Sequence, residues 1–483
     1  MVEAARVWVN EGFPTPSPRL TIPDFTSSIF PSFMKKLISL LILVGSFVAL
    51  GSLYWQVQRT EAQIDSLTVR LAAVKTDNAQ LKQSLAQDAK PAESEAAVRK
   101  ELESAVEQLH LLKFKQPIQY RTMKTGDFKE FMQKKINEVY TKEDLDMYSR
   151  AMALLGLVPD GTDISKVILG LYNEQVAAFY DQHKGELYTF SDFSLSENLD
   201  RMLLSHEMTH ALQDQNFNLK KFPLEVKDND DLTLSTSALI EGDATLLMTL
   251  WYMQHAMQNL DISSLFKDLG SMFSQTSADQ LAAAPAYFQQ TLLFPYQQGN
   301  EFVMALYTEG GYGAINKAFE KPPVSTEQIL HPQKFTKRED PVEVKLPELK
   351  ITGWKPAFAN VLGELGTRIL LEQNVTKFEA SRAAEGWGGD RYEVFKDGTG
   401  KLALLWVTVW DTETDAREFQ EAFDDAAHKR TGQTNIKHAA DGSGWMQYGS
   451  DAFQVALRKN SSQVTIALGP KESVAKIVSA LGK

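Results

Sequence analysis

The chain has 483 residues, of which 43% are hydrophobic, so it is long enough to bury at least one large core. Its formal net charge of −12 argues against nucleic acid as a partner, because proteins that bind nucleic acid concentrate positive charge. The sequence contains no cysteine, which excludes disulfides, thiolate zinc ligands and a lipid-modified cysteine.

The chain begins with two segments of very different composition. Residues 1–33 are rich in proline and serine without any periodicity, and we expect a disordered tail or an extension upstream of a true start at Met34. An uncharged apolar run from 37 to 55 follows, which as a helix spans about 28 Å, close to the thickness of the bilayer core. Two lysines precede the run, so residues 34–56 predict a single-pass anchor in a bacterial cell membrane, with the rest of the chain extracytoplasmic. The alternative is a cleaved signal peptide.

Residues 57–90 repeat apolar side chains with the 3–4 spacing of heptads. This pattern predicts a coiled-coil stalk, and Asn78 at an a position favours a parallel two-stranded coil, so we expect a homodimer. The alternative is one amphipathic helix packed on its own domain. Pro91 ends the segment, and a further amphipathic helix follows over 98–112.

Residues 96–338 predict a mostly helical domain that contains a small β-hairpin. Helical periodicity covers 128–140 and 142–155, whereas 175–180 and 186–190 read as two strands around a glycine-containing loop. The hairpin directly precedes another helical pattern, which carries the most informative residues of the chain.

That helix contains the string His206-Glu207-Met208-Thr209-His210. Histidines four residues apart lie on one helix face, one turn apart, and can both bind one Zn²⁺ at about 2.0–2.1 Å. Glu207 points about 100° around the helix, where it can take a proton from a zinc-bound water as general base. A catalytic zinc site needs a third protein ligand, and the best candidate is Glu241, which lies in a second apolar helical stretch.

H-E-x-x-H followed by a glutamate on the next helix resembles the gluzincin metallopeptidases, whose zinc site is thermolysin-like. The stretch Glu241-Gly242-Asp243-Ala244-Thr245 is similar to the third-ligand motif of the aminopeptidase N family, although the gap between motifs is longer here. A set of bacterial proteins combines H-E-x-T-H-A-L-Q-D-Q and E-G-D-A with P-P-x-S-T-E-Q-I-L-H-P, and this chain resembles them over roughly 114–335. The resemblance implies a zincin-like fold and a zinc metallopeptidase.

Hydrolysis of an amide also needs a donor for the developing oxyanion. The candidates are His331, which lies in the stretch PPVSTEQILHP, and the two tyrosines Tyr296 and Tyr312. The alternative role for His331 is a hydrogen bond that fixes its loop. Asp214 and Asp243 are candidates for a carboxylate that orients a ligand histidine.

Residues 345–483 predict a small α+β accessory domain with an antiparallel sheet and no catalytic spacing. A charged, proline-containing segment precedes it. We expect helices over 358–373, 414–429 and 472–481, and strands over 391–396, 401–410, 445–448, 453–458 and 463–468.

The sequence therefore predicts an α+β fold, with a membrane helix and coiled coil before a mostly helical zincin-like domain and a small α+β domain after it. We expect a membrane-anchored zinc metallopeptidase that binds peptide or protein substrates of the cell envelope and no nucleic acid. The alternative is a non-catalytic envelope scaffold or binding protein built on a peptidase-like domain. An intact Glu207 favours the enzyme, because a scaffold has no need of a general base.

Overall fold

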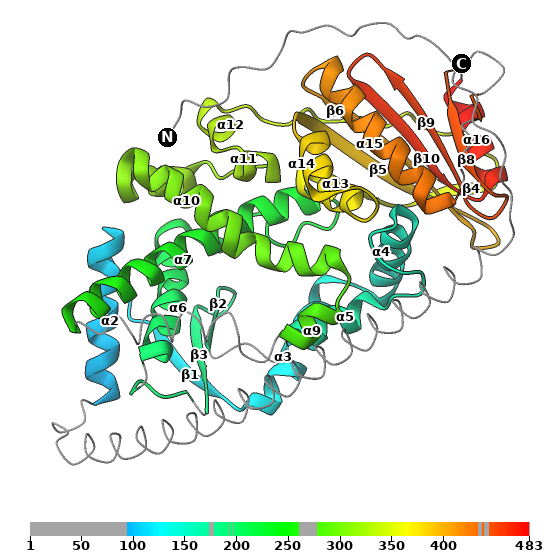
Figure 1. Cartoon of the computed structure of the whole chain (residues 1–483). Helices are drawn as coiled ribbons and strands as arrows, with labels where there is room; N and C mark the ends of the chain where they lie inside the picture. Colours follow the sequence, from blue (N-terminus) through cyan, green and yellow to red (C-terminus); the bar gives the residue numbers. More distant parts are fainter. Residues whose placement is uncertain are drawn as a thin grey trace, which may run out of the picture. The chain divides into compact units, whose positions relative to one another are not determined.

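The computed structural model describes residues 94–482 except 173–177, 192, 197, 260–277, 433–436 and 439–443. Glu93–Lys483 form one compact unit (Figure 1). The predicted tail, membrane anchor and coiled coil, over 1–33, 34–56 and 57–90, lie outside the described residues. The predicted boundary between 96–338 and 345–483 falls in a segment without helix or strand, residues 338–353.

Two predictions are corrected here. No helix among the described residues is both long enough and apolar enough to cross a membrane. For the described residues, the predicted fold class is therefore corrected to an α+β fold without a transmembrane helix, and these residues give no support to the placement of the chain as a single-pass membrane protein. The described chain is an α+β protein whose long helices α7 (Asp230–Asn259) and α10 (Ala286–Glu320) interrupt their apolar runs with polar residues.

The helical part is built around the contact of α7 with α10 and with α6 (Asn198–Phe217). The axes of α7 and α10 come very close at two glycines, because a Cβ on Gly242 would lie 2.3 Å from the carbonyl group of Gly299. Helix α2 (Glu95–His110) packs on α6 and α7 with one stripe of buried residues, Val98, Leu102, Val106 and His110. This spacing of four is that of a single helix face.

A three-stranded sheet with the order β1-β3-β2 lies beside α6. The antiparallel hairpin of β2 (Ala178–Asp181) and β3 (Glu186–Phe190) confirms the predicted hairpin. The sequence did not predict β1 (Gln119–Met123), which pairs with β3 in parallel. The neighbouring helices are α3 (Thr125–Val139), α4 (Lys142–Leu155), α5 (Ile164–Tyr172), η1 (Leu219–Lys221) and α9 (Ala278–Ala283).

Helix α10 is bent near its end, where Gly310 and Gly311 leave the helical conformation. The φ of 58° at Gly311 lies in the left-handed region that favours glycine. Two short helices follow, α11 (Thr326–Leu330) and α12 (Pro332–Lys337), and they carry the PPVSTEQILHP stretch towards the C-terminal part.

The C-terminal part contains a seven-stranded sheet with the order β4-β5-β6-β10-β9-β8-β7, in which neighbouring strands are antiparallel. Helix α15 (Glu413–Thr431) covers the face that includes Trp406, and α16 (Lys471–Leu481) covers the face that includes Leu405 (Figure 1). Strand β6 is buried on both faces, and its sequence is accordingly apolar except for Thr408. The strands are β4 (Trp354–Asn360), β5 (Trp387–Asp397), β6 (Leu402–Trp410), β7 (Lys437–His438), β8 (Met446–Gly449), β9 (Gln454–Asn460) and β10 (Gln463–Gly469).

Most predicted elements of this part are confirmed, and the differences include the region from β4 to α14. The helix expected over 358–373 is the end of strand β4 followed by helix α13 (Gly363–Glu372), and α14 (Lys377–Ala384) was not predicted. Gly363 has φ +74°, and its α-carbon lies so near the Asp231 carboxylate that a Cβ there would clash with it. The glycine therefore marks the change from strand to helix, which helical periodicity alone does not reveal.

Candidate metal centre

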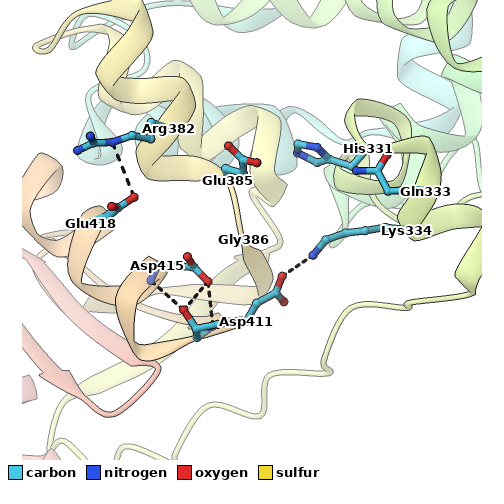
Figure 2. A pocket seen from close by; sticks show the side chains of 10 residues that line it. His331, Gln333, Lys334, Arg382, Glu385, Gly386, Asp411, Asp415 and Glu418 are labelled. Carbon is cyan, nitrogen blue, oxygen red and sulfur yellow. Dashed lines mark hydrogen bonds and ion pairs between the residues drawn. The ribbon is translucent and has the colours of Figure 1, made fainter.

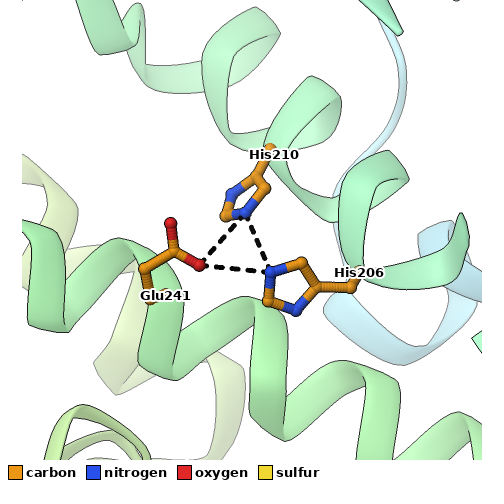
Figure 3. Close-up of side chains that lie close together, drawn as sticks. All are labelled: His206, His210 and Glu241. Carbon is orange, nitrogen blue, oxygen red and sulfur yellow. Dashed lines mark hydrogen bonds and ion pairs between the residues drawn. The ribbon is translucent and has the colours of Figure 1, made fainter. Parts of the chain in front are cut away.

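Three side chains from α6 and α7 converge on one point, as Figure 3 shows. His206 Nε2 lies 3.1 Å from both His210 Nε2 and Glu241 Oε2, and His210 Nε2 lies 3.4 Å from the same oxygen. Ligand atoms that bind a tetrahedral zinc ion at about 2.0–2.1 Å lie about 3.3–3.4 Å from one another. The three atoms therefore fit one zinc ion, and the donor set of two imidazoles and one carboxylate suits zinc chemically.

The electrostatics of this cluster favour a cation at its centre. Burial alone would raise the pKa of Glu241, but the charges and hydrogen bonds of the two histidines hold it well below its usual range. Burial alone would lower the pKa of His210, but Glu241 outweighs this effect and raises it to about 10. Without a metal, a proton is therefore held where a metal would bind, so metal and proton compete for the same nitrogen atoms.

Glu207 lies one residue after His206, and the backbone of the hairpin fixes its carboxylate. Glu207 Oε2 accepts a hydrogen bond from the backbone N–H of Tyr180 in β2, at 2.8 Å. Burial raises the pKa of Glu207, which brings this carboxyl group nearer to the range of an effective general base at neutral pH. Strand β2 therefore positions the candidate base relative to the metal ligands on α6.

The tautomer of His210 is set by Gln213, one turn further along α6. His210 Nδ1 lies 2.9 Å from Gln213 Oε1, while Gln213 Nε2 donates to Ile240 O at 3.0 Å and to Asp243 Oδ2 at 2.8 Å. The opposite orientation of the amide would place its oxygen against two acceptors. His210 Nδ1 therefore carries the proton, which leaves Nε2 with the lone pair that a metal requires.

Neither predicted orienting carboxylate contacts a ligand histidine directly. Asp214 accepts from the hydroxyl of Tyr180 at 2.8 Å and from the N–H of Leu219 at 2.9 Å, so it holds β2 and the turn after α6. Asp243 acts through Gln213, which the sequence reasoning did not identify. The spacing of three residues between His210 and Gln213, which places both on one helix face, was the available signal.

The structure places the three proposed oxyanion donors in different surroundings. Tyr296 is the one beside the metal ligands, since its ring lies 6.2 Å from that of His206 and its side chain is 42% exposed. Tyr312 is buried, with its ring 4.4 Å from that of His110. His331 instead pairs with Glu364, and none of its described contacts is with His206, His210 or Glu241.

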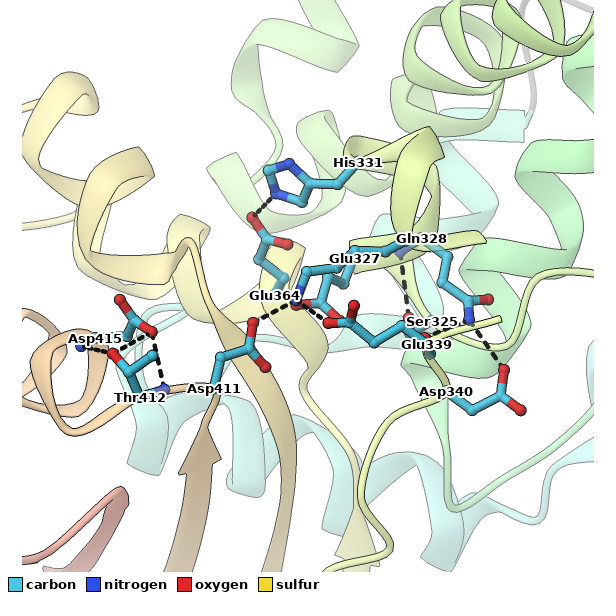
Figure 4. A network of polar contacts seen from close by, with 11 residues as sticks. Ser325, Glu327, Gln328, His331, Glu339, Asp340, Glu364, Asp411, Thr412 and Asp415 are labelled. Atoms are coloured by element: carbon cyan, nitrogen blue, oxygen red, sulfur yellow. Dashed lines mark hydrogen bonds and ion pairs between the residues drawn. The ribbon is translucent and has the colours of Figure 1, made fainter. Parts of the chain in front are cut away.

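His331 belongs to a polar network that joins α11 and α12 to the C-terminal part (Figure 4). His331 Nε2 lies 2.9 Å from Glu364 Oε1 in α13, and this hydrogen bond raises the pKa of His331. Nearby, Lys334 binds Glu327, Glu339 and Asp411. The role that the structure gives His331 is the loop-fixing hydrogen bond that was its alternative.

A cavity of about 350 Å³ opens beside this network (Figure 2). Its lining side chains carry charges of both signs, and most are already paired: Lys334 with Asp411, Arg382 with Glu418, and Asp415 with the backbone and side chain of Thr412. The lining includes none of His206, His210 and Glu241, so the cavity is distinct from the metal centre. Its charged groups mainly hold α12, α14 and α15 together.

Residues 354–479 are matched by a family described as Domain of unknown function (DUF8575). The matched stretch runs from β4 into α16 and so covers the seven-stranded sheet and its helices. No curated protein matches the chain. Among solved structures, the chain is similar to one described as "a putative hydrolase with a novel fold" from Chloroflexus aurantiacus, with a TM-score of 0.33 and 18% identity over 50% of this chain and 88% of that one. Similarity this low carries no information on the activity of this chain.

Proposed function

We propose that this chain is a zinc-dependent metallopeptidase of the gluzincin type. The single observation that carries the proposal is the triangle of His206, His210 and Glu241 ligand atoms, with edges of 3.1 to 3.4 Å. Three protein ligands, two of them histidines on one helix turn, leave a fourth position open, and this is the arrangement of catalytic zinc sites.

The metal, when bound, supplies the Lewis acidity that makes a water molecule a nucleophile at neutral pH. Glu207 accepts the proton of this water on its carboxylate and returns it to the leaving amine nitrogen. The hydrogen bond from Tyr180 keeps the Glu207 carboxylate in place during both steps. Gln213 keeps His210 in the tautomer that binds metal.

Two further features favour a peptide as the substrate. Strand β2 is an outer strand of its described sheet and contacts α6, so an extended peptide can pair with its edge. Tyr296 lies beside His206 with an exposed side chain, and its hydroxyl is the donor that we assign to the developing oxyanion. Peptide or protein substrates are therefore the class that we propose.

The alternative is a binding protein that keeps the metal for structure alone. Structural zinc sites use four protein ligands, whereas three converge here. Next to them, the half-buried carboxylate of Glu207 accepts a hydrogen bond from one backbone N–H, and no cation among the described residues pairs with it. Both observations favour catalysis over a scaffold role.

The experiment is a peptidase assay on the full chain with a mixture of fluorogenic peptides, together with metal analysis by mass spectrometry. We expect one zinc per chain and cleavage that o-phenanthroline abolishes. Glu207→Gln keeps the zinc and loses at least about 10²-fold in activity, because the general base is gone. Glu241→Ala loses zinc and activity, whereas Glu130→Gln, a change at an exposed glutamate of α3, alters neither. Full zinc content in Glu241→Ala, or cleavage that the chelator leaves intact, contradicts the proposal.

A further inference from the structure

A buried chain of hydrogen bonds connects the metal centre to helix α2, which contributes no metal ligand. His110, the last residue of α2, lies with Nε2 2.8 Å from Asp243 Oδ2. The same oxygen accepts from Gln213 Nε2 at 2.8 Å, and Gln213 Oε1 lies 2.9 Å from His210 Nδ1. His110, Asp243 and Gln213 are each fully buried, so water does not substitute for these partners.

Only one assignment of donors and acceptors satisfies all the hydrogen bonds from His110 to His210. Asp243 as a carboxylate can only accept, so His110 Nε2 and Gln213 Nε2 must both carry hydrogen. The amide oxygen of Gln213 then faces His210, whose Nδ1 must donate. The position of the proton on the metal ligand therefore follows from groups three hydrogen bonds away.

His110 supplies half of the hydrogen bonding that Asp243 receives from side chains. The Asp243 side chain is fully buried, and a buried carboxylate without donors is costly. Both donors bind Oδ2, so loss of His110 leaves Gln213 as the remaining side-chain donor and leaves the carboxylate free to turn. A turned carboxylate no longer opposes the flipped amide of Gln213, which leaves Ile240 O as the one acceptor that still opposes it.

The position of His110 is itself fixed against α6, the helix that carries His210. Directly after α2, the backbone N–H groups of Lys115 and Gln116 donate to Gln215 Oε1 at 2.7 and 3.0 Å. Asn216 Nδ2 donates to Lys113 O at 3.1 Å. The chain just after α2 and the end of α6 are therefore joined next to the hydrogen bonds that run from His110 to His210.

We propose that His110 is a positioning residue of the metal site, which holds His210 in its metal-binding tautomer and orientation through Asp243 and Gln213. The inference rests on the proposed function for the identity of the metal. It extends the active centre to α2, so that metal affinity depends on the docking of a helix that touches neither metal nor substrate.

The test compares variants of the full chain at residue 110. A glutamine places its Nε2 near the position of the imidazole Nε2, whereas an asparagine is too short to reach Asp243. Direct partners of a metal ligand typically change metal affinity by about 10- to 100-fold. His110 acts through Gln213 and Asp243, so we expect His110→Asn to weaken zinc binding by the lower of these factors, about 10-fold, in competition with a chromophoric chelator. His110→Gln should restore most of the affinity.

Two further readouts separate positioning from general stability. The absorption spectrum of the Co²⁺-substituted protein should change in His110→Asn and resemble the native one in His110→Gln, and kcat should fall in His110→Asn with KM unchanged. Val106→Ala is the matched control, because Val106 lies on the same buried stripe of α2 but takes no part in the hydrogen bonds from His110 to His210. It should lower the melting temperature without changing zinc affinity or the Co²⁺ spectrum.

The outcomes distinguish this inference from the proposed function. A native protein that binds no zinc overturns the proposed function and, with it, this inference. Native zinc affinity and a native Co²⁺ spectrum in His110→Asn overturn the inference alone. Equal loss of zinc affinity in Val106→Ala and His110→Asn overturns it as well, because the effect then comes from loosening α2.

Discussion

The metal centre and the network around α11 both combine histidines with carboxylates, but they use these residue types differently. At the metal centre, His206, His210 and Glu241 direct three atoms at one common point. In the network around α11, the His331 ring pairs with Glu364, and Lys334 has its own carboxylate partners. Burial alone would lower the pKa of Lys334, but these partners raise it, as expected for a cation held in place. Three ligand atoms that converge on one point indicate a bound ion, whereas groups that pair off with separate partners indicate a structural role.

The largest expected effect is the difference between losing a metal ligand and losing His331, and it tests this comparison directly. His206→Ala should lose essentially all bound zinc and at least about 10³-fold in peptidase activity, because one of three ligands is missing. His331→Ala should keep the zinc and stay within about threefold of native activity, since the His331 ring contacts Glu364 and not a metal ligand. Metal analysis and kcat/KM on the two purified variants decide the question. Equal losses in both would place His331 in the active centre.

A second, smaller effect concerns the close approach of α7 and α10 that positions Glu241. In Gly242→Ala the new Cβ would lie 2.3 Å from backbone atoms of Gly299, so the helices must separate at a cost of about 1–3 kcal/mol or more. Zinc affinity should fall with stability, because Glu241 is the adjacent residue. Gly313→Ala in α10 is the control, since nothing lies within 4 Å of its Cβ. Chemical denaturation and chelator competition measure both effects, and a neutral Gly242→Ala would contradict this packing.

The smallest expected effect concerns the stability that the pair of His331 and Glu364 contributes. Its folded pKa is raised by Glu364, so the pair contributes its full stability below the unfolded histidine pKa of about 6.5 and loses it as pH rises through the folded value. His331→Gln should therefore destabilise the chain by about 1–2 kcal/mol at pH 6 and by less at pH 9. His183→Gln, which breaks an exposed pair with Glu225, should cost under about 0.5 kcal/mol at either pH. Urea denaturation at the two pH values tests this, and a difference that grows with pH would reverse the assignment.

The two clusters were not equally accessible from the sequence. The spacing of His206 and His210 indicates a shared helix face because helix geometry is local. Glu241 could be proposed because the metal needs a third ligand, and the pairing of α6 with α7 brings it there. The motif around His331 marks this histidine as a candidate but does not identify its partner. That partner, Glu364, lies in a different part of the fold.

The same limit applies to the fold. Helices such as α4 and α15 were predictable from periodicity and capping, since each begins with a threonine capping box. The parallel strand β1 was missed because parallel pairing joins residues about seventy positions apart and leaves no local pattern. Gln213 was missed because an amide gains its role from the carboxylate that fixes its orientation, and that carboxylate comes from another helix.

The hydrogen bond from Tyr180 to Glu207 has a consequence for how this site tolerates divergence. Its donor is a backbone N–H, which every amino acid except proline provides. Exchange of the residue at position 180 therefore leaves the base held, although the link to Asp214 is lost. An insertion or deletion in the hairpin is a different matter, because a shift of β2 by one residue turns its N–H groups to the opposite edge. Over evolutionary time, the length of this hairpin is constrained more tightly than its composition.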